Sequence, residues 1–145
     1  MSGERTKNGM PHVVPLSRQA AAILRALPRI GTSRFVFTTS GKTHVSGFSK
    51  SKKRLDALIA RRRLEQGIQE PLPDFVVHDL RRTVSTRMHE ELGIAPHIVE
   101  AVLNHVSGYR SGVARTYNRA RYMDEKRKAL AAWADHVQRL VESGA

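Results

Sequence analysis

The chain has 145 residues and no cysteine, and its 25 lysine and arginine residues against 13 aspartate and glutamate residues give a formal net charge of +12. The absence of cysteine excludes disulfide bonds, thiolate metal sites and thiol catalysis. No apolar stretch in the chain is long enough to span a membrane or resembles a signal peptide. We therefore expect one cytoplasmic domain, and the sequence pI near 11.1 favours a polyanionic partner, most simply nucleic acid.

The first part of the chain predicts a β-hairpin followed by a helix. Asn8-Gly9 is a typical tight-turn dipeptide, and residues 12–16 are expected to form a short strand after it. A helix is expected over about residues 18–27, where apolar residues recur at helical spacing. The apolar run at residues 35–37 fits either a strand or a buried loop.

Apolar periodicity and end signals predict further helices along the rest of the chain. Their expected ranges are about residues 46–63, 79–92, a stretch beginning at Pro96, 113–121 and 124–141. Together with the hairpin, these helices predict an α+β fold that is mainly α, with a small β-hairpin or sheet near the N-terminus.

The most specific chemical pattern is the segment His78-Asp79-Leu80-Arg81-Arg82. On a helix, His78 and Arg81 are three residues apart and share a face, whereas Arg82 is expected to face solvent. A guanidinium can hold two phosphate oxygens at once, and a neighbouring imidazole can donate or relay a proton. The pair therefore suits a phosphodiester whose negative charge must be stabilised during attack. An exposed basic helix start is the simpler alternative.

Two further motifs follow in order: Leu103-Asn104-His105 and then Tyr117. Together with the His-x-Leu-Arg pattern, they resemble the catalytic domains of tyrosine recombinases, especially phage-type integrases. The resemblance runs from residue 5 to about residue 135. It includes Lys7, in a segment similar to the hairpin that carries the family's lysine.

The resemblance implies a role for each matched residue. Tyr117 would attack the scissile phosphorus and form a 3′-phosphotyrosyl link to DNA, while Arg81, His78 and His105 would stabilise the non-bridging oxygens and manage protons. Lys7 would protonate the departing 5′ oxygen, and the 5′ hydroxyl of a partner strand would then join new strands. Because the phosphotyrosyl bond conserves the phosphodiester energy, the resemblance implies no metal and no other cofactor.

Some features of the family pattern have no counterpart in residues 1–145. The family also uses an earlier arginine, before the hairpin, and a core-binding domain that clamps the other face of the DNA. We therefore expect a single, partial C-terminal catalytic domain that by itself binds DNA weakly and cleaves it poorly. Asn104 stands where the family more often has glycine, and is tolerated there if it adopts a left-handed backbone conformation.

Basic residues outside the catalytic set are expected to contact the phosphate backbone, which positions a protein on DNA without reading its sequence. The candidates are Lys50, Lys52, Lys53, Arg54, Arg82, Arg115 and Arg119. The expected partners are double-stranded DNA and other recombinase protomers in a synaptic tetramer, with no membrane. The apolar face formed by Trp133, Val137 and Leu140 fits either exchange between protomers or packing on its own domain.

Other interpretations stay open at this point. Tyr117 fits an ordinary core tyrosine as well, and Tyr109 and Tyr122 are the other candidate nucleophiles. His78-Asp79 resembles the His-Asp pair of metal-dependent phosphohydrolases, although acids are scarce and the other histidines lack ligand spacing. The runner-up function is a non-catalytic, basic DNA-binding remnant of an integrase. A type IB topoisomerase would share the chemistry of strand cleavage but not its outcome.

Overall fold

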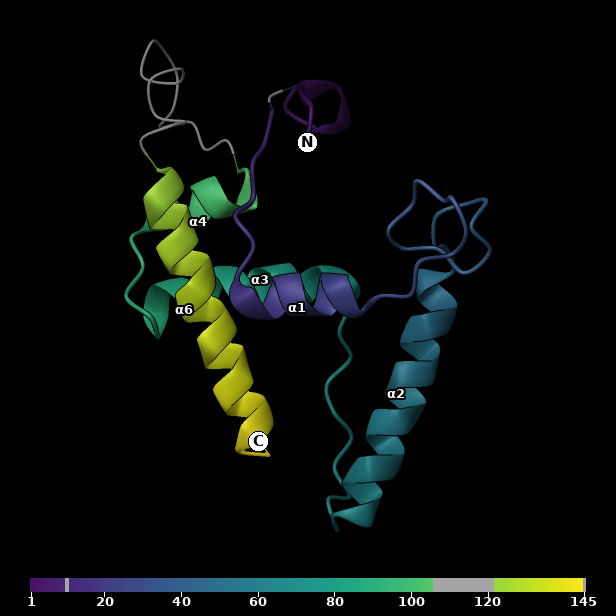
Figure 1. The fold of residues 1–145 in the computed structure, drawn as a ribbon. Coiled ribbons are helices and arrows are strands. Elements are labelled where there is room, and N and C mark those ends of the chain that lie inside the picture. Colours follow the sequence, from purple (N-terminus) through teal and green to yellow (C-terminus); the bar gives the residue numbers. More distant parts are fainter. Residues whose placement is uncertain (10, 106–121, 145) are drawn as a thin grey trace. The chain divides into compact units, whose positions relative to one another are not determined.

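The structure is a computed structural model that describes residues 1–9, 11–105 and 122–144. Figure 1 shows its elements in chain order, which are η1 (Gly3–Arg5), α1 (Arg18–Ala26), α2 (Phe48–Glu65), α3 (Val77–Glu90), α4 (Pro96–Leu103) and α6 (Met123–Glu142). The chain divides into two compact units. Unit 1 comprises Met1–Ala26 and Thr83–Ala145, and unit 2 comprises Leu27–Arg82.

The helices follow the periodicity and end signals of the sequence. In the described residues, five α-helices confirm the helical ranges predicted there, with small shifts at their ends. Proline occupies the first turn of α4, as predicted. Gly93 has a φ of 62°, which lets the chain reverse after α3 so that the Ile94 N–H donates to the Met88 carbonyl. The helix expected over residues 113–121 lies outside the described residues.

The core of unit 1 lies between α3, α4 and α6. Its buried apolar side chains, among the residues that the structure describes, are Met88, Ile98, Val99, Val102 and Ala129. Met88 is fully enclosed, with 0% of its surface exposed. Trp133 of α6 packs against this cluster, whereas Val141 at the other end of the helix is 74% exposed. The first part of α6 therefore packs on its own unit.

The predicted β-hairpin near the N-terminus is wrong, because the described residues contain no strand and all their regular structure is helical. The turn explains part of this result. A type I′ hairpin turn needs positive φ at both central residues, but of Asn8 and Gly9 only Gly9 has one, at 66°. The Gly9 N–H instead donates to the Thr6 carbonyl, so that Lys7 and Asn8 form the centre of the turn.

The backbone of the expected second strand, residues 12–16, finds partners outside a β-ladder. The N-terminal ammonium donates to the His12 carbonyl at 2.8 Å, and His12 Nε2 lies 3.2 Å from the Val102 carbonyl oxygen. The ammonium of the buried Lys126 donates to the Val13 carbonyl. Since this ammonium is removed from water, burial lowers the pKa of Lys126 below its ordinary value. The partners of His12 and Val13 therefore come from Met1, whose carbonyl also accepts the His12 N–H, and from α4 and α6.

Unit 2 is built around α2 and the segment that follows it. We call residues 68–76 the return segment, because they run back along α2 to the start of α3. Residues 35–37 form a loop, and Val36 and Phe37 are 60% and 58% exposed. Of the two expectations for this run, the structure shows a loop, but an exposed one. Because the chain divides into two compact units, the expectation of a single domain stays a prediction.

Replacing Met88 with alanine should lower the free energy of unfolding by about 2–5 kcal/mol, since the side chain fills the centre of the core of unit 1. Urea unfolding followed by far-UV circular dichroism measures this loss. Val141→Ala, at an exposed position of α6, is the matched control and should change the free energy of unfolding by less than about 0.5 kcal/mol. Equal losses in the two variants would contradict the central position of Met88.

Candidate functional site

The first turn of α3, in unit 2, carries two of the predicted catalytic residues, His78 and Arg81. The carboxylate of Asp79, the third residue of the helix, accepts the Val76 N–H at 2.8 Å. This contact is the acidic half of a capping box and also suits the positive end of the helix dipole. It fixes where α3 begins, so that the exposed His78 and the half-buried Arg81 share a face. Arg82 pairs with Asp79 at 3.2 Å, and its side chain is 77% exposed, as predicted.

In unit 1, hydrogen bonds bring the turn that carries Lys7 next to His105. The side-chain amide of Asn8 donates to the Asn104 carbonyl at 3.4 Å and to Asn104 Oδ1 at 3.1 Å, across 96 positions of the chain. Each asparagine is the immediate neighbour of a predicted catalytic residue. The backbones of Lys7 and His105 therefore lie near one another, and both side chains are exposed.

Asn104 ends α4 in the conformation that the sequence predicts for it. Its φ of 55° and ψ of 32° are left-handed, which asparagine tolerates better than most residues. The N–H groups of Asn104 and His105 both donate to the Glu100 carbonyl. This left-handed cap stops the helix and turns the chain directly before His105.

The predicted catalytic residues thus form two pairs: Lys7 and His105 belong to unit 1, whereas His78 and Arg81 belong to unit 2. The convergence of both pairs around one phosphate stays a prediction. The remaining candidates, all outside the described residues, are Tyr109, Arg115, Tyr117 and Arg119.

Tyr122, one of the other candidate nucleophiles, has a structural environment. It is the N-cap residue of α6, it is half-buried, and it packs against the core of unit 1. Its ring lies against the His97 ring, with 5.4 Å between the centroids. These contacts give Tyr122 a packing role at the start of α6.

The predicted DNA contacts on α2 differ in their surroundings. Lys50, Lys53 and Arg54 are exposed. The side chain of Lys52, in contrast, is only 14% exposed, and its Nζ lies 2.6 Å from Asp56 Oδ1. The ammonium of Lys52 is therefore occupied within the protein, whereas the other three cations face solvent.

The start of α2 has an unfavourable charge distribution for an isolated helix. Its first turn contains no acid, and its N-cap residue Gly47 provides no side-chain cap. Because the N-terminal end of a helix carries partial positive charge, Lys50 in the first turn raises the energy of the helix, and Lys53 and Arg54 in the next turn add positive charge close to it. A phosphate near this end would be attracted both by these side chains and by the helix dipole.

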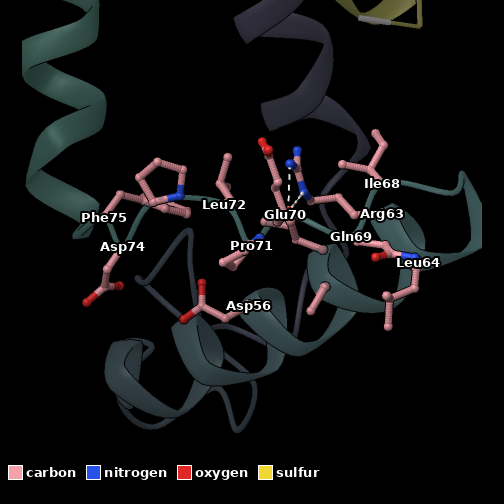
Figure 2. A pocket seen from close by; sticks show the side chains of 13 residues that line it. Asp56, Arg63, Leu64, Ile68, Gln69, Glu70, Pro71, Leu72, Asp74 and Phe75 are labelled. Atoms are coloured by element: carbon pink, nitrogen blue, oxygen red, sulfur yellow. Dashed lines mark hydrogen bonds between the residues drawn. The ribbon is translucent and has the colours of Figure 1, made fainter.

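A mainly apolar pocket of about 390 Å³ lies between α2 and the return segment. Figure 2 shows Arg63 at one side of it, where the guanidinium donates two hydrogen bonds to the Glu70 carbonyl at 2.9 and 3.1 Å. The apolar lining comes from Ile59, Ala60, Leu64, Ile68, Pro71, Leu72, Pro73 and Phe75. The return segment is thus held to α2 by polar contacts around an incompletely filled apolar space.

Within the described ranges, no three histidine, aspartate or glutamate side chains gather into a group that could hold a metal ion. None of the helices in those ranges is both long and apolar enough to cross a membrane.

Comparison with known proteins identifies the family. Residues 3–123 match the model of the phage integrase family. The chain belongs to this family. That finding confirms the resemblance to phage-type tyrosine recombinases expected from the motifs around Lys7, Arg81, His105 and Tyr117.

Three prophage integrases of Escherichia coli (strain K12) are similar to the chain. IntA is 35% identical over 135 residues, which cover 92% of this chain and 30% of IntA. IntZ is 30% identical over 142 residues, covering 97% of this chain and 32% of IntZ. IntS is 32% identical over 133 residues, covering 90% of this chain and 31% of IntS. The chain thus spans about a third of the length of these relatives, and no solved structure matches it.

Sequence reasoning missed two features of these sites: the contact between Asn8 and Asn104, and the enclosed position of Lys52. The sequence does contain a signal for the ion pair of Lys52. Asp56 is the only acid between Lys42 and Arg63, and it lies four residues after Lys52 on the helix. The contact of Asn8 had no comparable local signal, because its partner lies 96 positions away.

Asn104→Ala should be less stable than Asn104→Gly by about 1–2 kcal/mol, since both variants lose the Asn104 Oδ1 contact to Asn8 but only alanine keeps a Cβ, which lies too close to the following carbonyl in a left-handed conformation. Asn104→Gly should cost less, because glycine adopts this φ without steric conflict. Urea unfolding of both variants measures the difference. Equal stability of the alanine and glycine variants would contradict the left-handed turn before His105.

Proposed function

We propose that the chain supplies the catalytic-domain residues of an enzyme that cuts and rejoins DNA at specific sites through a 3′-phosphotyrosyl intermediate. Membership of the phage integrase family supports this reaction class, as does the similarity to three prophage integrases. The observation that carries the assignment of the site is the contact between Asn8 and Asn104, which joins the neighbourhoods of Lys7 and His105. Lys7 and His105, which are far apart in the sequence, would thus act on the same phosphate.

In the proposed reaction, the hydroxyl oxygen of Tyr117 attacks the scissile phosphorus, and the bond from phosphorus to the 5′ oxygen breaks. Arg81 holds the non-bridging oxygens, and His78 and His105 hydrogen-bond to them and move protons. These fixed donors stabilise the negative charge that develops during attack. Lys7 protonates the departing 5′ oxygen. Attack by the 5′ hydroxyl of a partner strand then releases the tyrosine and forms the new strand.

No cofactor is part of this proposal. The phosphotyrosyl ester keeps the energy of the original phosphodiester, so rejoining needs no nucleotide cofactor. The guanidinium and imidazole groups supply positive charge and hydrogen-bond donors to the phosphate, which is the task that a metal ion performs in other phosphoryl-transfer sites.

The exposed cations at the start of α2 form the proposed DNA interface on unit 2. Lys50, Lys53 and Arg54 would contact backbone phosphates, and the bound anion would remove the unfavourable clustering of positive charge at this helix end. Arg115 and Arg119 are proposed as further phosphate contacts from their place near Tyr117 in the sequence.

The proposed recombination joins strands of two duplexes, so it requires several protomers in a synaptic assembly on double-stranded DNA. The far end of α6 is a candidate contact between protomers, because Val137 and Val141 are 38% and 74% exposed. Trp133, in contrast, packs on its own unit. Since the substrate is DNA, we propose that the enzyme works in the cytoplasm.

Tyr117→Phe should abolish the covalent DNA adduct and leave the dissociation constant for DNA within about twofold, since only the hydroxyl is removed. The measurement is a denaturing gel of the 145-residue chain after incubation with a nicked duplex that contains the attachment site. We expect the chain to form the adduct slowly, and equally well with EDTA present.

Tyr122→Phe is the matched control, and it should retain the adduct. An adduct that persists in Tyr117→Phe would contradict the assignment of the nucleophile. Tight DNA binding without an adduct in any variant would favour the non-catalytic DNA-binding alternative.

Arg54→Gln should reduce the slope of the logarithm of the DNA-binding constant against the logarithm of salt concentration by about 0.9, the effect of one lost phosphate contact. Fluorescence anisotropy with a labelled duplex at several salt concentrations measures the slope. Arg61→Gln is the control on the same helix, because Arg61 already pairs with Glu65 at 2.8 Å. An unchanged slope in Arg54→Gln would argue against the α2 interface.

A further inference from the structure

The return segment is held to α2 at two points. Near the end of α2, Arg63 donates to the Glu70 carbonyl, and nearer its start Lys52 meets Asp74 and Phe75. The helix rises by roughly 16 Å from residue 52 to residue 63, whereas an extended chain from residue 70 to residue 74 spans at most roughly 14 Å. The two lengths fit an extended segment between these anchors, and Figure 2 shows residues 70–75 running along α2 away from Arg63.

Two prolines favour this extended course. Proline fixes its own φ and drives the preceding residue toward extended backbone, so Pro71 and Pro73 restrain the four residues 70–73. Such a segment is stiff, and it loses little conformational entropy when it is ordered. The far end of this segment, Asp74 and Phe75, comes directly before Val76 and the start of α3.

Lys52 contacts both of these residues. Its Nζ lies 2.6 Å from Asp56 Oδ1, 3.8 Å from Asp74 Oδ1 and 3.8 Å from the centroid of the Phe75 ring. An ammonium over an aromatic face is stabilised by the ring quadrupole, more so when it is shielded from water. The side chain of Lys52 is only 14% exposed, although Asp74 itself is 98% exposed.

Helix stability alone does not account for the pair of Lys52 and Asp56. A lysine four residues before an acid is the weaker orientation of such a pair on an isolated helix, and a cation near the helix start is unfavourable. The pair does hold the Lys52 ammonium over Phe75: Nζ lies 3.8 Å from the centroid of the ring.

We propose that Lys52 is a positioning residue: by holding Asp74 and Phe75 against α2, it sets where α3 begins and so orients His78 and Arg81. The roles of His78 and Arg81 rest on the function proposed above, whereas the contacts of Lys52 do not depend on it. This assignment replaces the earlier expectation that Lys52 binds DNA.

Only one residue, Val76, separates Phe75 from the first residue of α3. Phe75 is followed by Val76, whose N–H is held by the Asp79 carboxylate at the start of α3. A displaced Phe75 would move Val76 and break this cap. The first turn of α3 would then lose its defined start, and the side chains on it would lose their common orientation.

Hydrogen–deuterium exchange of the full 145-residue chain tests the contact directly. Lys52→Met removes the charge and keeps an unbranched side chain, whereas Lys52→Arg keeps a cation that can lie over the ring. We expect Lys52→Met to raise the exchange rates of the amides of residues 79–82 roughly tenfold, the combined effect of losing an ion pair and a cation–π contact. Lys52→Arg should restore most of the protection, and the amides of α6 should not change.

Lys42→Met is the matched control, since Lys42 is an exposed lysine of the same unit. Phe75→Leu is a second variant that removes the ring and keeps an apolar side chain, so it tests the same contact if Lys52→Met does not fold. We expect it to raise the same exchange rates. Unchanged rates in both variants, or an equal increase in Lys42→Met, would overturn the proposal.

The rate of covalent adduct formation at saturating DNA separates positioning from binding. We expect Lys52→Met to lower this rate while the dissociation constant for DNA changes less than about twofold, and Lys52→Arg to recover it. A weaker dissociation constant with a normal rate at saturation would make Lys52 a DNA contact and refute its positioning role. If even the unaltered chain forms no adduct, the proposed strand cleavage fails, and the exchange rates still decide the role of Lys52.

Discussion

Hydrogen bonds, more than apolar packing, hold the first part of the chain against α4 and α6. Asn8 donates to Asn104, and the buried Lys126 donates to a backbone carbonyl near the N-terminus, while Leu16 in the same part of the chain is 56% exposed. Apolar burial is non-directional, but a hydrogen bond fixes distance and angle. The position of the Lys7 turn relative to the end of α4 therefore depends on a few directional contacts, and the proposed pairing with His105 depends on that position.

The scarce carboxylates of this basic chain serve to position other groups. Asp79 caps α3 beside His78, and Asp56 and Asp74 hold the ammonium of Lys52. With only 13 acids for 25 lysine and arginine residues, the chain keeps an excess of positive charge, a formal net charge of +12. Such an excess raises the energy of the isolated chain and is lowered by a polyanion. The charge balance thus favours a polyanionic partner, as the proposed function requires.

Local patterns predicted the helices, whereas the hairpin depended on contacts that no local pattern shows. The backbone hydrogen bonds of a helix join residues four apart, so apolar periodicity and signals such as Pro96 were sufficient to predict α3 and α4. A strand needs a partner strand, but here the His12 backbone pairs with Met1, and the His12 ring and the Val13 carbonyl meet α4 and α6, which lie far along the chain. The left-handed conformation of Asn104 was predictable, because asparagine tolerates it better than most residues. The hydrogen bond from Asn8 to Asn104 was not predictable, because the two residues are 96 positions apart.

The DNA candidates on α2 show why a run of basic residues cannot be assigned to one role. Successive residues on a helix point about 100° apart, so Lys52 and Lys53 face different surroundings although they are neighbours in sequence. Arg63 lies eleven residues after Lys52, so the two side chains point within about 20° of the same direction on the helix. Both residues meet the return segment, one at Asp74 and Phe75 and the other at the Glu70 carbonyl. The face of α2 that packs against the return segment therefore engages both cations within unit 2, and the proposal assigns one of the DNA candidates, Lys52, to holding the chain that leads to α3.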